Sequence, residues 1–261
     1  MKKIKYSILI GLVILLVSVN PLGLKAYKIR TVVVDAGHGG DDSGCLGAAA
    51  KEKDVALKIA LTFGKMIEAN HKDVKVVYTR KDDRFLELHQ RASVANKNNA
   101  DLFISFHLNS ASAQAHGTET FTQGLHVTGA NLEVSKRENA SVLLESDYTE
   151  NYDGFDPKDP TTHIIFELFQ SAYRNQSIRF AEKIENNFEK RAGRFSRGVK
   201  QAGFLVLYRT TMPAVLIESG FLTNRNEEKF LTSPEGQQKM AESVYQAFVA
   251  YKAEIDKDGK P

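Results

Sequence analysis

Short apolar runs alternate with segments of helical periodicity along most of this sequence, and that alternation leaves few architectures open. Residues 30–35 form a β-branched run that suits a strand buried on both faces, and Val55, Ile59 and Phe63 then recur at helical spacing. A strand, a loop and a helix in this order open a parallel βαβ unit. No repeat or linker divides residues 27–256, so we expect one α/β domain there.

The rest of the chain continues the pattern. Further strands are predicted at residues 74–79, 102–106, 117–122, 204–208 and 214–217, and further helices at 86–99, at 161–191 and from 233 to about 255, followed by a frayed tail at 257–261. The strand at 117–122 is polar enough to suggest a sheet edge. The last helix has a clear N-terminal signal, because a capping serine, Ser233, precedes Pro234.

The N-terminus has the layout of a secretory signal peptide, with lysines first, an apolar run at residues 7–19 and a polar exit to Ala26. The apolar run falls short of the roughly 20 residues that span a bilayer. We therefore expect residues 1–26 to be removed and the product to be exported without a stable membrane span; an uncleaved anchor is the alternative.

Charge and cysteine content narrow the function classes. The formal net charge is +3, and the first 26 residues hold four lysines and no acid, so the remainder carries 3 − 4 = −1. A near-neutral chain without a basic cluster gives no reason to expect a nucleic-acid partner. The single cysteine, Cys45, excludes an internal disulfide, and nothing in the sequence points beyond a monomer.

Four polar side chains are expected on one rim of the sheet. His38 follows the first strand, His107 ends the strand in DLFISFH, Glu218 ends the strand in AVLIESG, and Glu52 lies where the first helix begins. Ligands in open α/β sheets bind outside the carboxyl ends of the strands, so these groups should converge. Two imidazoles and one carboxylate form a standard catalytic zinc set, and the remaining carboxylate can act as general base.

Each of these residues also has a structural explanation. His38 alone would be a hydrogen-bonded loop histidine, His107 a core histidine and Glu52 a solvated helix-start acid, whereas a buried Glu218 is costly without a function. Ligation by Cys45 is disfavoured. A dinucleotide fingerprint is excluded because Asp42 occupies the place of its third glycine. The other histidines are taken as surface or structural: His71, His89, His116, His126 and His163.

The motifs together resemble the type 3 family of zinc-dependent N-acetylmuramoyl-L-alanine amidases. They are DAGHGG, the acidic residue in KEKDVALKIA, YTRKDDRFLELHQRASVAN, SFHLNS, GTETF and FLVLYRTTMPAVLIESGFLTN, in the family's order from residue 29 to 251. The resemblance implies a single-domain, three-layer fold with a mixed, mostly parallel sheet of about six strands flanked by helices. The implied reaction is hydrolysis of the amide that joins the lactyl group of N-acetylmuramic acid to L-alanine in peptidoglycan.

The same resemblance assigns roles to residues. It implies that His38, Glu52 and His107 hold Zn²⁺ and that Glu218 is the catalytic glutamate. Asn109 stands where some relatives have an aspartate; an amide supplies no charge, so a hydrogen-bonding role is expected instead of ligation. Arg80 ends its own strand and would either meet a substrate carboxylate or pair with a neighbouring aspartate, and we favour the structural role.

The polar segment at residues 127–160 is long for a surface loop and contains SKRENASVLLES, which suits a short helix. It resembles the insertion of extended family members from cells with an outer membrane, in which a helix plugs the active site. On that match Glu138 meets the metal, the enzyme is exported inactive to the periplasm, and a LytM-type activator opens it. A solvated surface helix is the alternative.

Two other function classes remain open on the sequence. A different zinc hydrolase of the cell wall, such as a carboxypeptidase or a deacetylase, would use similar ligands. An inactive peptidoglycan-binding module would share the fold, although the intact Glu218 argues against it.

Overall fold

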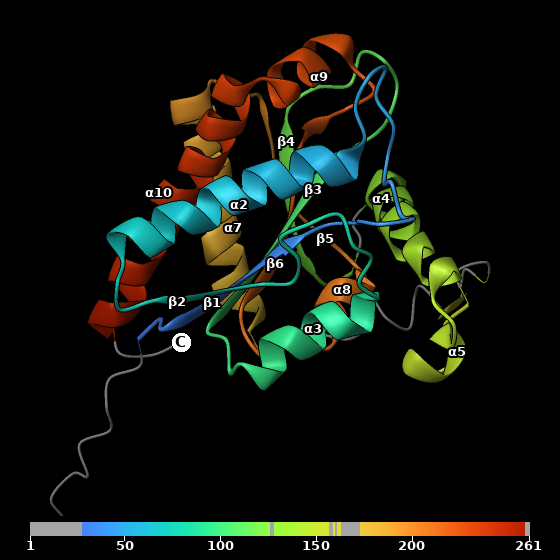
Figure 1. Cartoon of the computed structure of the whole chain (residues 1–261), viewed down its shortest axis with the longest axis horizontal. Helices are drawn as coiled ribbons and strands as arrows, with labels where there is room; N and C mark the ends of the chain where they lie inside the picture. The colour runs from blue at the N-terminus through green and yellow to red at the C-terminus, as the bar shows by residue number, and fades with distance from the viewer. Residues whose placement is uncertain (1–27, 126–127, 157–158, 160, 163–172, 259–261) are drawn as a thin grey trace, which may run out of the picture.

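The computed structural model describes residues 28–125, 128–156, 159, 161–162 and 173–258. Within them the chain forms a six-stranded sheet in the order β2-β1-β3-β6-β4-β5, with helices on both faces (Figure 1). The expected α/β class with a mixed, mostly parallel sheet is thereby confirmed. The strands are β1 (Thr31–Ala36), β2 (Lys75–Tyr78), β3 (Leu102–Asn109), β4 (Thr118–Gln123), β5 (Ser196–Ala202) and β6 (Ala214–Phe221).

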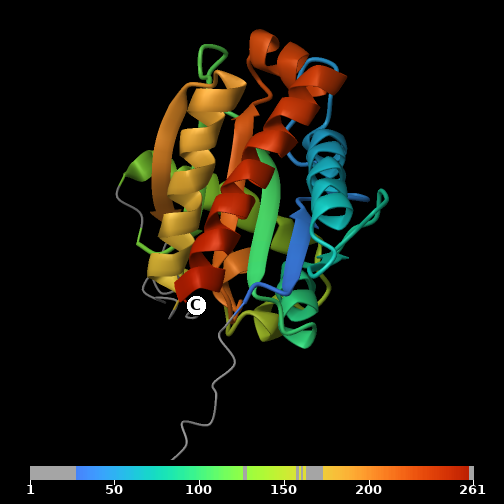
Figure 2. The ribbon, with the colours of Figure 1, turned by 90° about the vertical axis from the view of Figure 1, so that its left-hand side faces the viewer.

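Three long helices lie side by side across one face of the sheet, and shorter ones cover the other (Figure 2). On the first face α2 packs against β1 and β3, while α10 packs between α2 and α7. The helices are α2 (Glu52–Asn70), α3 (Leu88–Lys97), α4 (Gly129–Asn139), η1 (Ala140–Leu144, a 3-10 helix), α5 (Tyr148–Asn151), α7 (Arg174–Ala192), α8 (Leu205–Tyr208), α9 (Arg225–Thr232) and α10 (Pro234–Asp258). None of the described helices is long and apolar enough to cross a membrane.

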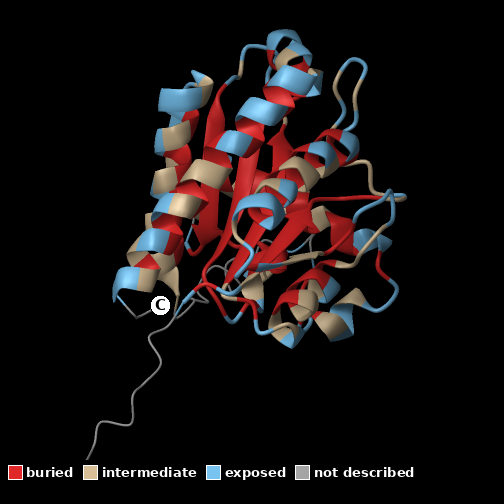
Figure 3. Ribbon diagram, turned by 60° about the vertical axis from the view of Figure 1, so that its left-hand side comes forward, coloured by how far each residue is buried: buried red, intermediate tan, exposed pale blue. Residues whose placement is uncertain are grey.

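Strand direction determines where the functional groups gather. β1, β3 and β6 run parallel, so their carboxyl ends meet at one edge, and β4 runs antiparallel to β6. The four inner strands of the sheet are buried, as Figure 3 shows in red, whereas β2 and β5 at the edges are mostly half-buried. The predicted edge strand is wrong, because β4 lies between β6 and β5 and all six of its residues are buried. The strand that forms this edge of the sheet, β5, was not predicted, whereas β2 at the opposite edge was.

The apolar run at 204–208 forms helix α8 instead of the predicted strand. Leu205, Val206 and Leu207 are all buried beneath the sheet's second face. In so short a run, periodicity does not separate a buried strand from a buried helical turn.

The predicted helix at 161–191 corresponds to α7, which begins at Arg174 and ends where Gly193 adopts a left-handed φ of 64°. Residues 163–172, like the predicted signal peptide at 1–26, lie outside the described part of the chain.

The insertion packs onto the domain instead of projecting from it. Val142, Tyr152 and Phe155 are at most 1% exposed and belong to the same apolar cluster as Phe121 on β4 and Phe204 before α8. Burying side chains of this size stabilises the packing by about 1.5–3 kcal/mol each. The segment is therefore an integral part of the second face in this conformation.

Candidate active site

The first functional side chain lies on a strained loop. His38 has a φ of 58°, in the left-handed region that non-glycine residues rarely adopt. Two buried arginines hold this loop: Arg91 donates to the His38 carbonyl at 2.9 Å, and Arg80 donates to the carbonyls of Ala36 at 2.9 Å and Gly37 at 2.7 Å. Strain of this kind persists where the surroundings fix it, and it concentrates at functional sites.

Side chains from this loop, from α2, from β3 and from the insertion meet in one place. His38, Glu52, His107 and Glu138 each offer one ligand atom, and these four atoms all lie within 4.8 Å of one another. Glu52 Oε1 lies 3.0 Å from His38 Nε2 and 3.1 Å from His107 Nδ1. All four residues are buried. The structure thus brings together the three sequence-predicted ligands and the predicted plug residue in one cluster that can hold a metal ion.

Glu52 is fixed by the backbone around it. Its Oε2 accepts a hydrogen bond from Cys45 N at 2.8 Å, and its Oε1 accepts one from Leu108 N at 2.9 Å. Gly44 permits this approach, because a Cβ there would lie 2.6 Å from both Glu52 Oε2 and the His38 ring. Gly37 does the same for the other imidazole, since its Cβ would lie 2.4 Å from His107.

Asp42 is a functional residue that the sequence did not reveal. Its Oδ2 lies 2.7 Å from His38 Nδ1, which leaves Nε2 directed at the cluster, and it also accepts a hydrogen bond from Ser141 at 2.8 Å. A carboxylate behind a histidine fixes the ring orientation and tautomer of a metal ligand. The spacing His-x-x-x-Asp was visible, but the aspartate served there only to exclude a phosphate site.

Glu218 lies next to His107, because the two residues are paired across β3 and β6. Its side chain is fully buried, and its Oε2 has no hydrogen-bond partner among the described residues. Its Oε1 lies 3.3 Å from the guanidinium of Arg137. A buried carboxylate with one free oxygen beside the cluster is poised to exchange a proton with a group bound there.

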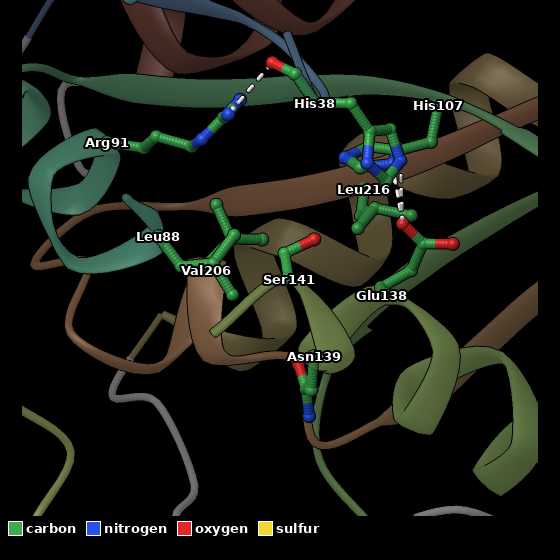
Figure 4. A pocket seen from close by; sticks show the side chains of 9 residues that line it. All are labelled: His38, Leu88, Arg91, His107, Glu138, Asn139, Ser141, Val206 and Leu216. Carbon is green, nitrogen blue, oxygen red and sulfur yellow. Dashed lines mark hydrogen bonds and ion pairs between the residues drawn. The ribbon is translucent and has the colours of Figure 1, made fainter. Parts of the chain in front are cut away.

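Helix α4 places two consecutive side chains in the site. Glu138 Oε2 lies 2.9 Å from His107 Nδ1 and 3.2 Å from His38 Nε2, and Figure 4 shows its carboxylate directed at the two imidazole rings. Arg137 Nε donates to Glu138 Oε1 at 3.0 Å, and its other end reaches Glu218. Arg137 was missed; the only signal was a basic residue directly before the predicted plug.

Protonation in the cluster follows from this crowding of acids. Burial lowers the pKa of His38, but Glu52, Asp42 and Glu138 outweigh it and raise that pKa well above its ordinary value. Burial also lowers the pKa of His107, yet Glu138 and Glu52 raise it to about 9. Burial and the neighbouring Glu138 raise the pKa of Glu218, against the opposing effect of Arg137. The ring of acids therefore favours positive charge at its centre, as a metal ion would supply.

The remaining predicted residues have structural contacts. Asn109 donates its side-chain amide to Glu119, so it makes the expected kind of hydrogen bond. Arg80 is 1% exposed and bonds backbone carbonyls instead of the predicted aspartate. Burial raises the pKa of the Cys45 thiol, whose Sγ lies 3.2 Å from the Leu108 carbonyl.

A second group of possible ligands lies away from this site, where Glu87, His89 and Glu145 meet. Glu145 accepts a hydrogen bond from Leu88 N at 2.8 Å, and the Tyr152 hydroxyl accepts one from His89 N at 2.7 Å. These bonds fasten the insertion to the start of α3. His89 therefore belongs to a structural contact, as the sequence suggested.

Comparison with known proteins agrees with this geometry. The chain matches the family described as N-acetylmuramoyl-L-alanine amidase over residues 32–250. It is 35% identical over 237 residues to the N-acetylmuramoyl-L-alanine amidase AmiC of Escherichia coli, covering 88% of this chain but only 55% of AmiC. It is 31% identical to AmiA of Escherichia coli K12, covering 89% of this chain and 79% of AmiA.

Solved structures show the same fold. The catalytic domain of CwlV, an N-acetylmuramoyl-L-alanine amidase from Bacillus (Paenibacillus) polymyxa, aligns with a TM-score of 0.61 at 31% identity, covering 85% of this chain and 98% of that one. An N-acetylmuramoyl-L-alanine amidase from Clostridium difficile 630 aligns with a TM-score of 0.63 at 27% identity, covering 86% and 97%.

An α/β sheet with a buried histidine and glutamate cluster at its carboxyl edge defines a class of proteins whose site can hold a metal ion. Within that class, this chain belongs to the N-acetylmuramoyl-L-alanine amidase family.

Proposed function

We propose that this protein hydrolyses the amide bond between the lactyl group of N-acetylmuramic acid and L-alanine in peptidoglycan. One observation supports this above the others: the three candidate ligands His38, Glu52 and His107 converge next to a second buried carboxylate, Glu218, in a chain of the amidase family. A binding module would have no use for a buried glutamate with an unpartnered oxygen.

The cluster fits zinc. Two imidazole nitrogens and one carboxylate oxygen are the usual catalytic zinc donors, and His38 Nε2 is buried without a hydrogen-bond partner among the described residues. A bound Zn²⁺ would polarise the scissile carbonyl and lower the pKa of water toward about 7.

The chain's own residues supply the positioning and the proton transfers. Asp42 holds the His38 ring, and two backbone N–H groups hold the Glu52 carboxylate. Glu218 accepts a proton from the attacking water and then delivers it to the nitrogen of the departing L-alanine. The carbon–oxygen bond forms first and the carbon–nitrogen bond then breaks, giving the lactyl carboxylic acid and the free peptide amine; the acid then passes its proton to the amine, so the products are a carboxylate and an ammonium group.

Regulation by the insertion is the second part of the proposal. Glu138 occupies the space between the two imidazoles that substrate would need, and Arg137 contacts the catalytic Glu218. We infer that residues 127–160 hold the enzyme inactive until a partner, of the LytM type, displaces α4. We also propose that residues 1–26 direct export and that the protein acts in the periplasm during wall remodelling or daughter-cell separation.

Digestion of purified peptidoglycan tests the reaction. The zinc-loaded protein carrying Glu138→Ala should release intact stem peptides with a free L-alanine amine, identified by mass, and a chelator should stop the release. Glu218→Gln keeps the shape of the side chain but cannot carry the proton, so it should lose the activity. Release of D-alanine or acetate instead would identify a carboxypeptidase or deacetylase, and binding without any release would identify a binding module.

Comparison of single variants tests the plug. Glu138→Ala should raise the rate over the unsubstituted chain, and Arg137→Ala should raise it further when combined. Glu133→Ala is the matched control, because Glu133 is an exposed residue of the same helix and its ion pair among the described residues is with Lys136. Equal rates for Glu138→Ala, Glu133→Ala and the unsubstituted chain would refute inhibition by α4.

A further inference from the structure

A second buried glutamate lies directly beside the catalytic one. The antiparallel register of β4 and β6 pairs Glu119 with Glu218. Side chains paired in this way on one face of a sheet lie roughly 5 Å apart at Cβ. Glu119 is only 2% exposed, and the pairing places its side chain on the same face of the sheet as that of Glu218.

Cations from the edge strand surround Glu119. Lys200 Nζ contacts Glu119 Oε2, and Arg197 Nε lies 3.3 Å from the same oxygen, while the Asn109 amide donates to Oε1. Among the described residues, the salt bridges of both cations go to Glu119 alone. Two positive charges therefore share one carboxylate, which leaves a surplus of one positive charge beside the active site.

The two cations are open to approach from outside. The Arg197 side chain is 36% exposed and that of Lys200 is 22% exposed, although both reach a carboxylate that is nearly buried. The Arg197 guanidinium also lies 5.1 Å from the Phe221 ring and makes a 3.5 Å bond to the His116 carbonyl. A cation that is held in place, only partly solvated and incompletely neutralised is suited to bind an anion.

We propose that Lys200 and Arg197 bind the carboxylate of the second residue of the stem peptide, with Glu119 as the residue that positions them. This inference rests on the proposed amidase function. An extended peptide advances about 3.3–3.6 Å per residue, so the second residue lies about 7 Å from the scissile amide. The distance from Glu218 to the two cations is similar, because Glu119 lies on the neighbouring strand directly opposite Glu218 and the cations contact the Glu119 carboxylate. Peptidoglycan stems carry D-glutamate or its α-amide at that position.

The inhibitory helix bears on this subsite as well. α4 packs against β5, the strand that carries both cations. Displacement of α4 would therefore clear the metal-ligand cluster and widen the approach to Lys200 and Arg197 at the same time. The two parts of the substrate would gain access together.

Steady-state kinetics on two soluble substrates test the assignment. One is N-acetylmuramoyl-L-alanyl-γ-D-glutamyl-L-lysine, whose glutamate keeps a free α-carboxylate, and the other carries D-isoglutamine, the α-amide, in place of D-glutamate. In the zinc-loaded Glu138→Ala chain, we expect a lower KM for the acid than for the amide. Lys200→Met or Arg197→Met alone should raise KM for the acid about 10- to 100-fold with kcat nearly unchanged, the size expected for a lost charge-assisted hydrogen bond. Neither should affect the amide.

Single substitutions are used because each leaves Glu119 with one cation and so preserves its burial. Lys200→Arg should retain the preference for the acid. The control is Lys239→Met, which removes an exposed lysine paired with Glu235 on α10 and should change neither substrate. If one methionine variant does not fold, as judged by circular dichroism, the other is tested alone.

The outcomes separate this inference from the reaction itself. No preference for the acid, or an equal loss on both substrates, would overturn the subsite. If neither substrate is cleaved, the proposed function fails, and calorimetric titration with free L-alanyl-D-glutamyl-L-lysine and its isoglutamine counterpart then decides the subsite. Tighter binding of the acid that is lost in Lys200→Met would support it, and equal or absent binding of the two peptides would refute it.

Discussion

The loop that carries His38 depends on one buried ion pair. The loss of unfolding free energy on breaking that pair can be predicted. Asp35, on β1, is fully buried and lies 3.1 Å from Arg91 NH1, and it accepts hydroxyl bonds of 2.6 Å from Ser105 and from Thr79. Asp35→Asn keeps the shape but leaves the Arg91 guanidinium without its counter-charge. Loss of one partner of a buried pair costs about 3–5 kcal/mol of unfolding free energy.

The pH dependence has a defined sign. Burial raises the pKa of Asp35, but Arg91, Ser105 and Thr79 outweigh it and hold the pKa below its ordinary value of 3.8. A group with a lowered folded-state pKa contributes stability that is present above pH 3.8 and is lost as the pH falls through the lowered value. The difference in unfolding free energy between the unsubstituted chain and Asp35→Asn should therefore be constant near pH 7 and become smaller in acid.

Urea unfolding followed by circular dichroism at several pH values measures both effects. The control is Asp82→Asn, because Asp82 is 68% exposed and makes a surface ion pair with Arg84 at 3.4 Å. Such pairs contribute at most about 1 kcal/mol. An Asp35→Asn effect no larger than that of Asp82→Asn, or a difference that does not shrink below pH 3.8, would refute the assigned role of the pair.

Three further predictions concern the site and the insertion. Asp42→Asn should weaken zinc affinity about 10- to 100-fold, measured by competition with a chromogenic chelator, because the carboxylate behind His38 is lost; unchanged affinity would contradict that role. Gly44→Ala should abolish zinc binding and also lower the melting temperature, because Gly44 has a φ of 63° and the new Cβ would collide with two ligands; unchanged zinc affinity would contradict this. Tyr152→Phe removes the hydroxyl that accepts the His89 N–H bond at 2.7 Å and should lower stability by about 1 kcal/mol, with faster proteolysis of the insertion; identical cleavage would contradict the fastening.

The ligand set could be predicted because strand direction alone collects it. His38, His107 and Glu218 each follow or end a strongly apolar run, and parallel strands place such ends on one edge. Glu52 joins the set because it is the first residue of the helix that begins at that edge. Glu138 was accessible only through the family resemblance, since its contact with His107 joins two segments that no local periodicity relates.

The sheet's far side could not be predicted for a physical reason. Thr118 and Thr120 on β4 are fully buried, yet they are polar, because both donate hydroxyl bonds to Glu185 on α7. A buried strand whose polar side chains form hydrogen bonds with a helix distant in sequence has the same composition as an edge strand. The edge strand beside β4, β5, has the sequence SRGVKQA, whose charges and glycine mask its strand character.

The position of α4 explains why opening would need a partner. Asn139, directly after the two inhibitory residues, donates to the Gly203 carbonyl at 2.7 Å and accepts from Leu205 N at 2.9 Å, both in buried surroundings. Buried hydrogen bonds of this kind stabilise by about 1 kcal/mol each, and the apolar side chains of the insertion add to them. Moving an equilibrium from 1:99 to 99:1 takes about 5.5 kcal/mol of differential binding. If α4 inhibits the enzyme as we propose, thermal opening is therefore rare, and we expect a protein that binds the displaced insertion to supply this free energy.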